Sequence, residues 1–154
     1  NISDDLFMYW TRPLTGLRPN QLYDVTVTVD FVSNYGQGCQ VGNAASVWIK
    51  AGLVPEKPER VLDNDNWVRL NVDKGQQASG SANVLVLGDI RNGQAGCSGT
   101  APFATNRHVS ATRALRVRAS EDGSFWVLLG TESGFEGAHE IFFTRLRFDL
   151  RPVQ

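Results

Sequence analysis

Apolar and polar residues alternate with a period of two between positions 23 and 31. The apolar positions are Tyr23, Val25, Val27, Val29 and Phe31, and the polar positions between them are Asp24, Thr26, Thr28 and Asp30. Because successive side chains of a β-strand point to opposite faces, this pattern predicts a strand with one buried and one solvated face. Gly16, Pro19 and Asn20 supply turn residues before it. The segment therefore predicts half-buried antiparallel β-structure.

Similar β patterns recur along the chain, separated by turns rich in glycine and proline. The segments are 46–51, 67–72, 83–88, 114–119, 125–130 and 140–150. The almost wholly apolar segment 125–130 predicts a central strand with Trp126 in the core, and Glu121, Asp122 and Gly123 before it predict a hairpin turn. No window combines a helical period with capping residues. We predict an all-β fold, a two-sheet antiparallel β-sandwich of the jelly-roll type, with residues 1–154 as a single domain.

The near-zero net charge of the chain limits the kinds of binding partner that we expect. Fifteen Lys and Arg residues oppose sixteen Asp and Glu residues, which leaves a net charge of −1. No global field favours nucleic acid, so we expect no nucleic-acid partner. A local basic strip at Arg113, Arg116 and Arg118 is interpreted as the solvated face of a strand. No apolar run approaches the ~20 residues of a membrane helix, so no transmembrane segment is expected.

The two cysteines and the first residue indicate in which cellular compartment the protein is expected. Cys39 and Cys97 both lie in polar loops rich in glycine, and neither has the spacing of a zinc site. We predict a disulfide between them, worth roughly 4 kcal/mol on the chain-entropy model, which implies the periplasm, the cell surface or the exterior. The alternative is two reduced, unrelated thiols. Because the chain opens with Asn1, we expect a processed product whose signal peptide is absent.

Family resemblances agree with this picture. Gly16, Leu17, Pro19 and Tyr23, followed by the alternating strand, are typical of jelly-roll carbohydrate-binding modules and fibronectin-like sandwiches. The segments 46–52, 70–77 and 125–137 together resemble a family of uncharacterised bacterial secreted proteins and lipoproteins, from about Leu6 to Leu150. The resemblance implies the fold and export. Because that family has no established activity, it transfers no catalytic residue.

The loop 132–137 is the first candidate ligand site. Glu132 and Glu136 lie four positions apart, with Phe135 between two glycines. An exposed aromatic face stacks on a sugar ring, and carboxylates accept hydrogen bonds from sugar hydroxyls. In the alternative interpretation Phe135 packs into the core and the glutamates are solvated. Trp67 and Trp10 border polar segments and are further candidates for a ligand platform.

Asp63 and Asp65 are the candidate metal ligands. The segment 63–66 places oxygen-bearing side chains at alternate positions, which suits structural calcium. It is not an EF-hand, because Trp67 and Val68 occupy positions that require Asn or Asp and then Gly. The alternative is a turn of Asn and Asp residues before the next strand. The chain termini are a second possible calcium site, through Asp4, Asp5 and Asp149.

No complete catalytic motif is present, so we interpret the chain as a non-catalytic protein. A glycosidase needs two carboxyl groups about 5–9 Å apart, and the candidates are Glu56, Asp73, Glu132, Glu136 and Glu140. The sequence predicts an exported bacterial envelope or extracellular protein, and within that class a glycan-binding module whose partner is a glycan or another envelope component. The alternatives are a structural or protein–protein interaction domain, which docks through an edge strand or an apolar patch, and a glycan hydrolase.

Overall fold

The computed structural model describes residues 6–38, 44–97, 100–134 and 138–154. Within them the chain forms strands and one short 3-10 turn, η1 (Ala44–Ser46). The strands are β1 (Leu6–Leu14), β2 (Leu22–Ser33), β3 (Val47–Val54), β4 (Arg60–Leu62), β5 (Val68–Leu70), β6 (Val84–Asp89), β7 (Ala104–Val109), β8 (Leu115–Arg118), β9 (Phe125–Ser133) and β10 (Ile141–Pro152). In this part of the chain no helix has the length and apolar character needed to cross a membrane.

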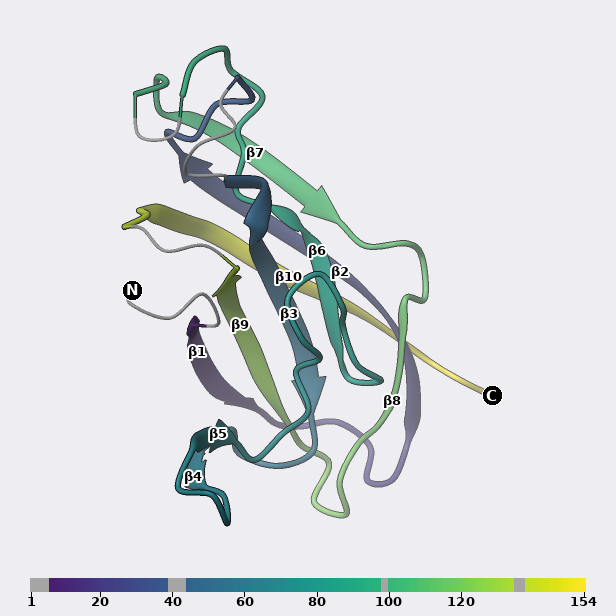
Figure 1. The fold of residues 1–154 in the computed structure, drawn as a ribbon. Coiled ribbons are helices and arrows are strands. Elements are labelled where there is room, and N and C mark those ends of the chain that lie inside the picture. The colour runs from purple at the N-terminus through teal and green to yellow at the C-terminus, as the bar shows by residue number, and fades with distance from the viewer. Residues whose placement is uncertain (1–5, 39–43, 98–99, 135–137) are drawn as a thin grey trace.

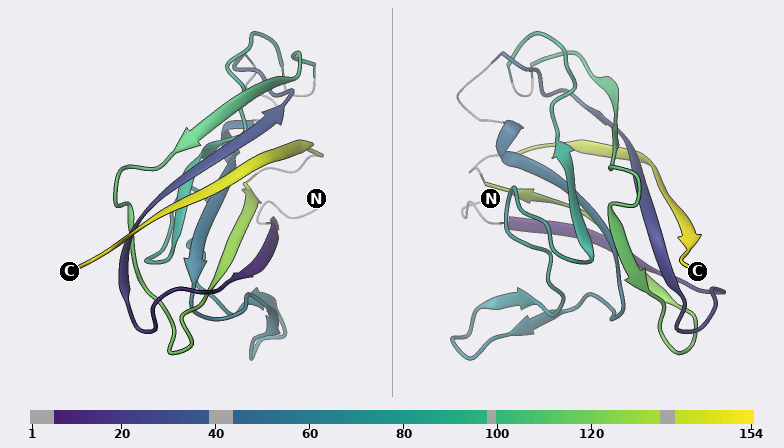
Figure 2. Two further views of the ribbon diagram at one scale, coloured as in Figure 1. Left: turned by 180° about the vertical axis from the view of Figure 1, so that it is seen from behind. Right: turned by 90° about the vertical axis from the view of Figure 1, so that its right-hand side faces the viewer.

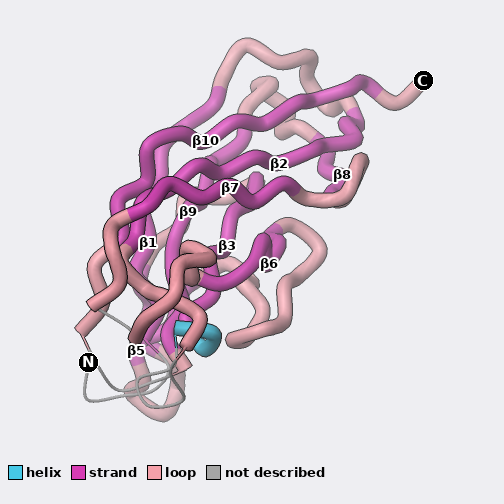
Figure 3. The backbone as a smooth tube through the Cα atoms, turned by 90° about the horizontal axis from the view of Figure 1, so that it is seen from above, coloured by secondary structure: helices cyan, strands magenta, loops and turns pink. Residues whose placement is uncertain are grey.

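Two antiparallel sheets pack face to face, as the sequence predicts (Figure 1). Sheet A has the order β1-β9-β3-β6, and sheet B has the order β10-β2-β7, with β8 also paired to β2. Seen from above, β10, β2 and β7 run side by side (Figure 3). The all-β, two-sheet sandwich is therefore confirmed. The strand order does not establish a jelly roll, which stays a prediction.

The core lies between the inward faces of the two sheets. On β2, the side chains of Val25, Val27, Val29 and Phe31 are fully buried, as their alternation predicts. On sheet A they meet alternate residues of β3 and β9, in a single cluster. The apolar strand β9 is central, because it pairs with β1 on one side and β3 on the other.

The turn before β9 corrects one prediction. Ser120 and Ser124 close a tight turn through several hydrogen bonds, and Gly123 adopts a left-handed φ of 72°. However, β8 pairs with β2 in sheet B, whereas β9 belongs to sheet A. The predicted hairpin is therefore wrong, because turn residues determine the local reversal but not the sheet in which the next strand finds its partner.

The outer face of sheet A, which points away from sheet B, carries a second apolar layer. Val54, Val84 and Leu128 are buried there, and five half-buried side chains pack on them: Phe7, Tyr9, Leu70, Val72 and Trp126. Trp126 therefore packs on this outer layer and not between the sheets. The layer is formed in part by the segment between β3 and β6, which includes the β4–β5 hairpin.

The β4–β5 hairpin projects beyond the ends of the two sheets (Figure 2). Its strands pair Arg60 with Leu70 and Leu62 with Val68. Beside it, β1 lies close against β9. A Cβ added to Gly130 would lie 2.4 Å from the Met8 carbonyl oxygen, so only glycine allows this approach. Residues of β1 and of the hairpin line the site described below.

Candidate functional site

Three segments of the chain converge on the outer face of sheet A. They are the segment 46–52, which lies almost wholly in β3, the segment 70–77, which begins at the last residue of β5, and the last part of β9. They bring together the side chains of Lys50, Lys74 and Glu132. These are also the segments on which the family resemblance rests, so the structure joins them in one cluster.

Lys50 and Glu132 form an ion pair whose two side chains are both fully buried. The Lys50 ammonium also donates hydrogen bonds to the carbonyl oxygens of Lys74, at 3.0 Å, and Ser79, at 2.9 Å. Gly75 allows this arrangement, because it has a left-handed φ of 69° and a Cβ there would lie 2.2 Å from the Ser79 oxygen. A buried charge is tolerated only when it is paired and hydrogen-bonded, and Lys50 meets both conditions.

Glu132 is shared between two lysines. Its second carboxylate oxygen accepts a hydrogen bond from the Lys74 ammonium, whose side chain is 21% exposed. Burial by itself raises the pKa of Glu132, but hydrogen bonds from Lys50 and Lys74 outweigh it and hold the pKa below its ordinary value of 4.5. The carboxylate is therefore ionised at neutral pH, and two ammonium groups share a single negative charge.

Lys74 is the member of this cluster whose charged group reaches the surface. Its ammonium lies 5.3 Å from the centre of the Phe7 ring, within the range of a cation–π interaction, and donates a hydrogen bond to the Gly75 carbonyl oxygen. The Phe7 ring in turn stacks on Tyr9, with ring centres 5.5 Å apart. The result is an ammonium group fixed beside two aromatic rings.

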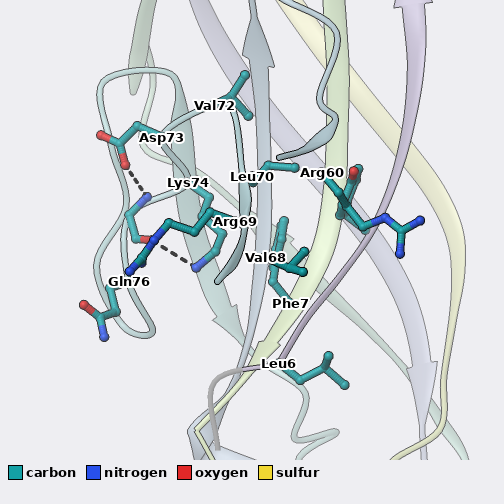
Figure 4. A pocket seen from close by; sticks show the side chains of 12 residues that line it. Leu6, Phe7, Arg60, Val68, Arg69, Leu70, Val72, Asp73, Lys74 and Gln76 are labelled. Atoms are coloured by element: carbon teal, nitrogen blue, oxygen red, sulfur yellow. Dashed lines mark hydrogen bonds between the residues drawn. The ribbon is translucent and has the colours of Figure 1, made fainter. Parts of the chain in front are cut away.

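The Lys74 side chain lines a groove of about 640 Å³ between β1, the β4–β5 hairpin and the segment 72–76 (Figure 4). We call it the Lys74 groove. Its lining residues are Leu6, Phe7, Tyr9, Arg60, Val68, Arg69, Leu70, Val72, Asp73, Lys74, Gly75 and Gln76. The volume lies within the range of about 300–1,000 Å³ that is usual for small-ligand sites.

The groove has an apolar floor and a mostly cationic rim. Arg60, Arg69 and Lys74 bring positive charges, and Asp73 is the one carboxylate among the lining residues of the described chain. Asp73 accepts a hydrogen bond from the Gly75 amide at 2.8 Å, and Arg69 pairs with Asp63 of the hairpin turn. Such a groove can hold a ring or an apolar body on its floor and hydrogen-bond acceptors at its rim.

Of the predicted ligand residues, the structure describes Glu132 and Trp67, and it does not bring these two together. Glu132 lies in β9 and is fully buried, so it does not stand on the exposed loop that the sequence predicts. Phe135 and Glu136 lie outside the described residues. Trp67 is 68% exposed in the turn of the β4–β5 hairpin and does not line the Lys74 groove. Trp10, on β1, is also exposed.

Asp63, a predicted calcium ligand, closes the hairpin turn. Its carboxylate accepts hydrogen bonds from the backbone amides of Asp65, at 3.0 Å, and Trp67, at 2.8 Å, and from the Arg69 side chain. The Arg69 hydrogen bond is the main cause of the lowered pKa of Asp63. This geometry matches the turn that the sequence also allows. The described residues contain no group of three or more side chains suited to hold a metal ion.

Cys39 lies outside the described residues, so the predicted disulfide with Cys97 stays a prediction. The two loops nevertheless run side by side. The Gln37 amide donates to the Gln94 carbonyl oxygen at 3.0 Å, and the Gly38 amide to that of Gly96 at 3.2 Å. The two loops are thus hydrogen-bonded to each other at Gly38 and Gly96, the residues that immediately precede the two cysteines.

Sequence reasoning missed Lys50 and Phe7 as site residues. One signal was present, because Lys50 interrupts an otherwise apolar strand, just as Glu132 follows the apolar run of β9. A lone charge in such a strand requires a partner when the strand is buried. The identity of that partner depends on the sheet order.

No family model, no curated protein and no solved structure matches this chain. The resemblance to bacterial secreted proteins and lipoproteins therefore stays a prediction. The site has to be interpreted from its own geometry.

Proposed function

We propose that the protein is an exported, non-catalytic glycan-binding module, and that the Lys74 groove is its binding site. The observation that carries the proposal is Lys74 itself, which the buried Glu132 carboxylate holds beside the stacked rings of Phe7 and Tyr9. A sugar offers both an apolar ring face and hydroxyl acceptors. A fixed donor next to an aromatic floor suits that combination.

The binding mechanism that follows is docking onto a preformed surface. A sugar ring packs on the apolar floor, and its oxygens accept hydrogen bonds from Lys74 and Arg60. The Arg60 side chain is exposed and has no hydrogen-bond or ion-pair partner in the described part of the chain, so its donors are available. Because Lys74 is already positioned, binding requires little reordering of its long side chain.

A hydrolase is less well supported by the groove. Glycosidases place two carboxyl groups on either side of the scissile bond, but among the described lining residues only Asp73 carries one. Glu132, a member of the predicted dyad, is bound to two lysines. The proposal therefore assigns binding and no bond cleavage to this site.

Export is part of the same proposal. The hydrogen bonds between residues 37–38 and 94–96 hold the two cysteine-bearing loops together, which supports a Cys39–Cys97 disulfide. A stable disulfide belongs to an oxidising compartment such as the periplasm or the exterior. An envelope or extracellular location also places the groove among glycans.

The test is a binding screen of the purified protein on immobilised glycans, including peptidoglycan fragments, followed by a matched pair of variants. Val68 and Leu62 face each other in the hairpin and are 65% and 69% exposed, but only Val68 lines the groove. We expect Val68→Asp to weaken binding at least tenfold and Leu62→Asp to change it less than twofold. No retained glycan, or equal loss in both variants, would contradict the proposal.

A second candidate function is docking of a protein partner on the hairpin. Four large apolar side chains are exposed there: Val61, Leu62, Trp67 and Val68. Exposed apolar patches of this kind mark interaction sites. The same variants separate the two functions, because a protein partner that covers the hairpin is weakened by Leu62→Asp as well as by Val68→Asp.

A further inference from the structure

Seven arginines gather on the outer face of sheet B, which points away from sheet A. The strand registers place Arg145, Arg147 and Arg151 of β10 on the same face as Arg107 of β7 and Arg116 of β8. Arg118 follows on β8, and Arg113 approaches Asp24 at 3.6 Å. We call these seven residues the arginine face. The sequence shows only part of it, as a strip on one strand.

Two cross-strand triplets organise this face. In the first, Asp30 of β2 lies between Arg107 and Arg145, and Arg107 binds its carboxylate through two hydrogen bonds of 2.5 and 3.0 Å. In the second, Asp24 lies between Arg116 and Arg151, with a 2.8 Å hydrogen bond from Arg116. Each aspartate brings one negative charge against at least two arginines, so positive charge is left in excess at both triplets.

The charge of this face differs from that of the whole chain. The face holds three aspartates against its seven arginines, with Asp149 of β10 as the third. Four positive charges remain in excess on one face of a protein whose net charge is −1. Hydrogen bonds from Arg107 and Arg116 lower the pKa values of Asp30 and Asp24, so this arrangement persists at neutral pH.

Arg145 and Arg151 are the two guanidinium groups that remain available for a ligand. Both are exposed, and within the described residues neither has a hydrogen-bond partner. They lie on the edge strand β10, six residues apart, which corresponds to about 20 Å along an extended strand. A small anion can reach only one of them, whereas a linear polyanion can engage both.

We propose that the arginine face binds a linear acidic polysaccharide, a chain that carries carboxylate groups at intervals along its length. The planar guanidinium fork binds a carboxylate through two parallel hydrogen bonds. Between the triplets the face presents Thr26 and Thr28, whose hydroxyl groups can bond to sugar hydroxyls.

Nucleic acid fits this face less well. The outward-facing strand positions of β2 and β10 between the two triplets are Thr26, Thr28, Arg147 and Asp149, and none of them is an aromatic side chain on which a base could stack. The three aspartates lie among the arginines and would repel the densely spaced phosphates of a duplex. This surface is on the opposite sheet from the Lys74 groove and does not depend on the proposed function.

The test measures binding of the whole chain to polygalacturonate at 50 mM salt, with neutral dextran and duplex DNA as comparison polymers. The variant Arg145→Gln/Arg151→Gln removes the two available groups. The control Arg12→Gln/Arg18→Gln removes two other exposed arginines and changes the net charge equally. We expect at least a tenfold loss for the first pair, less than a twofold loss for the control, and weaker binding at 300 mM salt.

Three results would overturn the proposal. They are no binding of polygalacturonate by the unmodified protein, an equal loss in both double variants, and tighter binding of duplex DNA than of polygalacturonate at equal polymer charge. Val68→Asp tests whether the polymer binds in the Lys74 groove instead. If Val68→Asp loses polygalacturonate binding and Arg145→Gln/Arg151→Gln keeps it, the polymer binds in the groove. Unchanged thermal unfolding of each variant confirms that the fold is intact.

Discussion

Replacing Glu132 with glutamine removes the single negative charge that two lysines share. The main effect falls on Lys50, because its side chain is fully buried and cannot turn to solvent. Lys50 keeps the carbonyl oxygens of Lys74 and Ser79 as acceptors but loses its ion pair with the Glu132 carboxylate. Lys74 is partly exposed and can reach water through the groove, so its contribution to the loss is small.

The expected magnitude follows from the burial of this pair. Removing one partner of a buried ion pair costs about 3–5 kcal/mol, because the other charge is left uncompensated. We expect Glu132→Gln to lower the free energy of unfolding by about 4 kcal/mol at pH 7. With a urea m-value of about 2 kcal/mol/M, the midpoint falls by about 2 M. Tryptophan fluorescence during urea unfolding measures this shift.

A double variant separates the charge effect from packing. Lys50→Met/Glu132→Gln removes both buried charges, so we expect it to regain at least half of the lost stability. The exposed Glu56→Gln serves as a control and should lie within about 0.5 kcal/mol of the unmodified protein. If Glu132→Gln unfolds at the same urea concentration as that control, the buried pair does not stabilise this fold as argued.

The same pair makes the stability depend on pH. Because the folded pKa of Glu132 lies below its ordinary value of 4.5, its contribution is fully present above about pH 4.5 and is lost as the pH falls through the folded pKa. The Glu132→Gln variant has no carboxylate at this position, so its stability does not depend on pH through this group. We therefore expect the stability difference between the two proteins to shrink between pH 7 and pH 3, as followed by urea unfolding at each pH, and a constant difference would contradict the assignment.

Three further changes test other parts of the structure. Gly75→Ala should destabilise the fold by about 1–3 kcal/mol in urea unfolding, because Gly75 has a left-handed φ and an added Cβ would clash with the backbone of Ser79 and Gly80; an unchanged midpoint would contradict this. Asp63→Ala should make the β4–β5 hairpin the first site of limited proteolysis, and an unchanged cleavage pattern would show that the turn does not need the carboxylate. Thiol titration of denatured, unreduced protein should find Cys39 and Cys97 unreactive, and two free thiols would exclude the disulfide.

The parts of the fold that the sequence predicted are those with a clear local pattern. β2 alternates over nine residues between apolar and polar side chains, and β9 is an apolar run, so each was recognisable without knowledge of its neighbours. β1 was not predicted as a strand, because both of its faces are apolar. Its outer residues Phe7 and Tyr9 pack in the second layer, and Met8 on the other face is exposed.

The candidate site could not be predicted in the same way. The cluster of Lys50, Lys74 and Glu132 depends on β3 and β9 being neighbours and on the segment after β5 crossing over both of them. No local pattern carries that information. The arginine face has the same origin, since β10 and β7 contribute to it only because both pair with β2.

The most direct test of the central claim is an NMR titration of ¹⁵N-labelled protein with the uncharged glycan that binds most tightly in the screen, because an acidic glycan could also bind the arginine face. We predict that the largest amide shifts fall on the residues around the Lys74 groove, with Phe7, Val68 and Lys74 among them, and that Val68→Asp abolishes them. Shifts that instead follow β2 and β10, or a screen that yields no binding glycan, would contradict the assignment of the groove as a glycan-binding site.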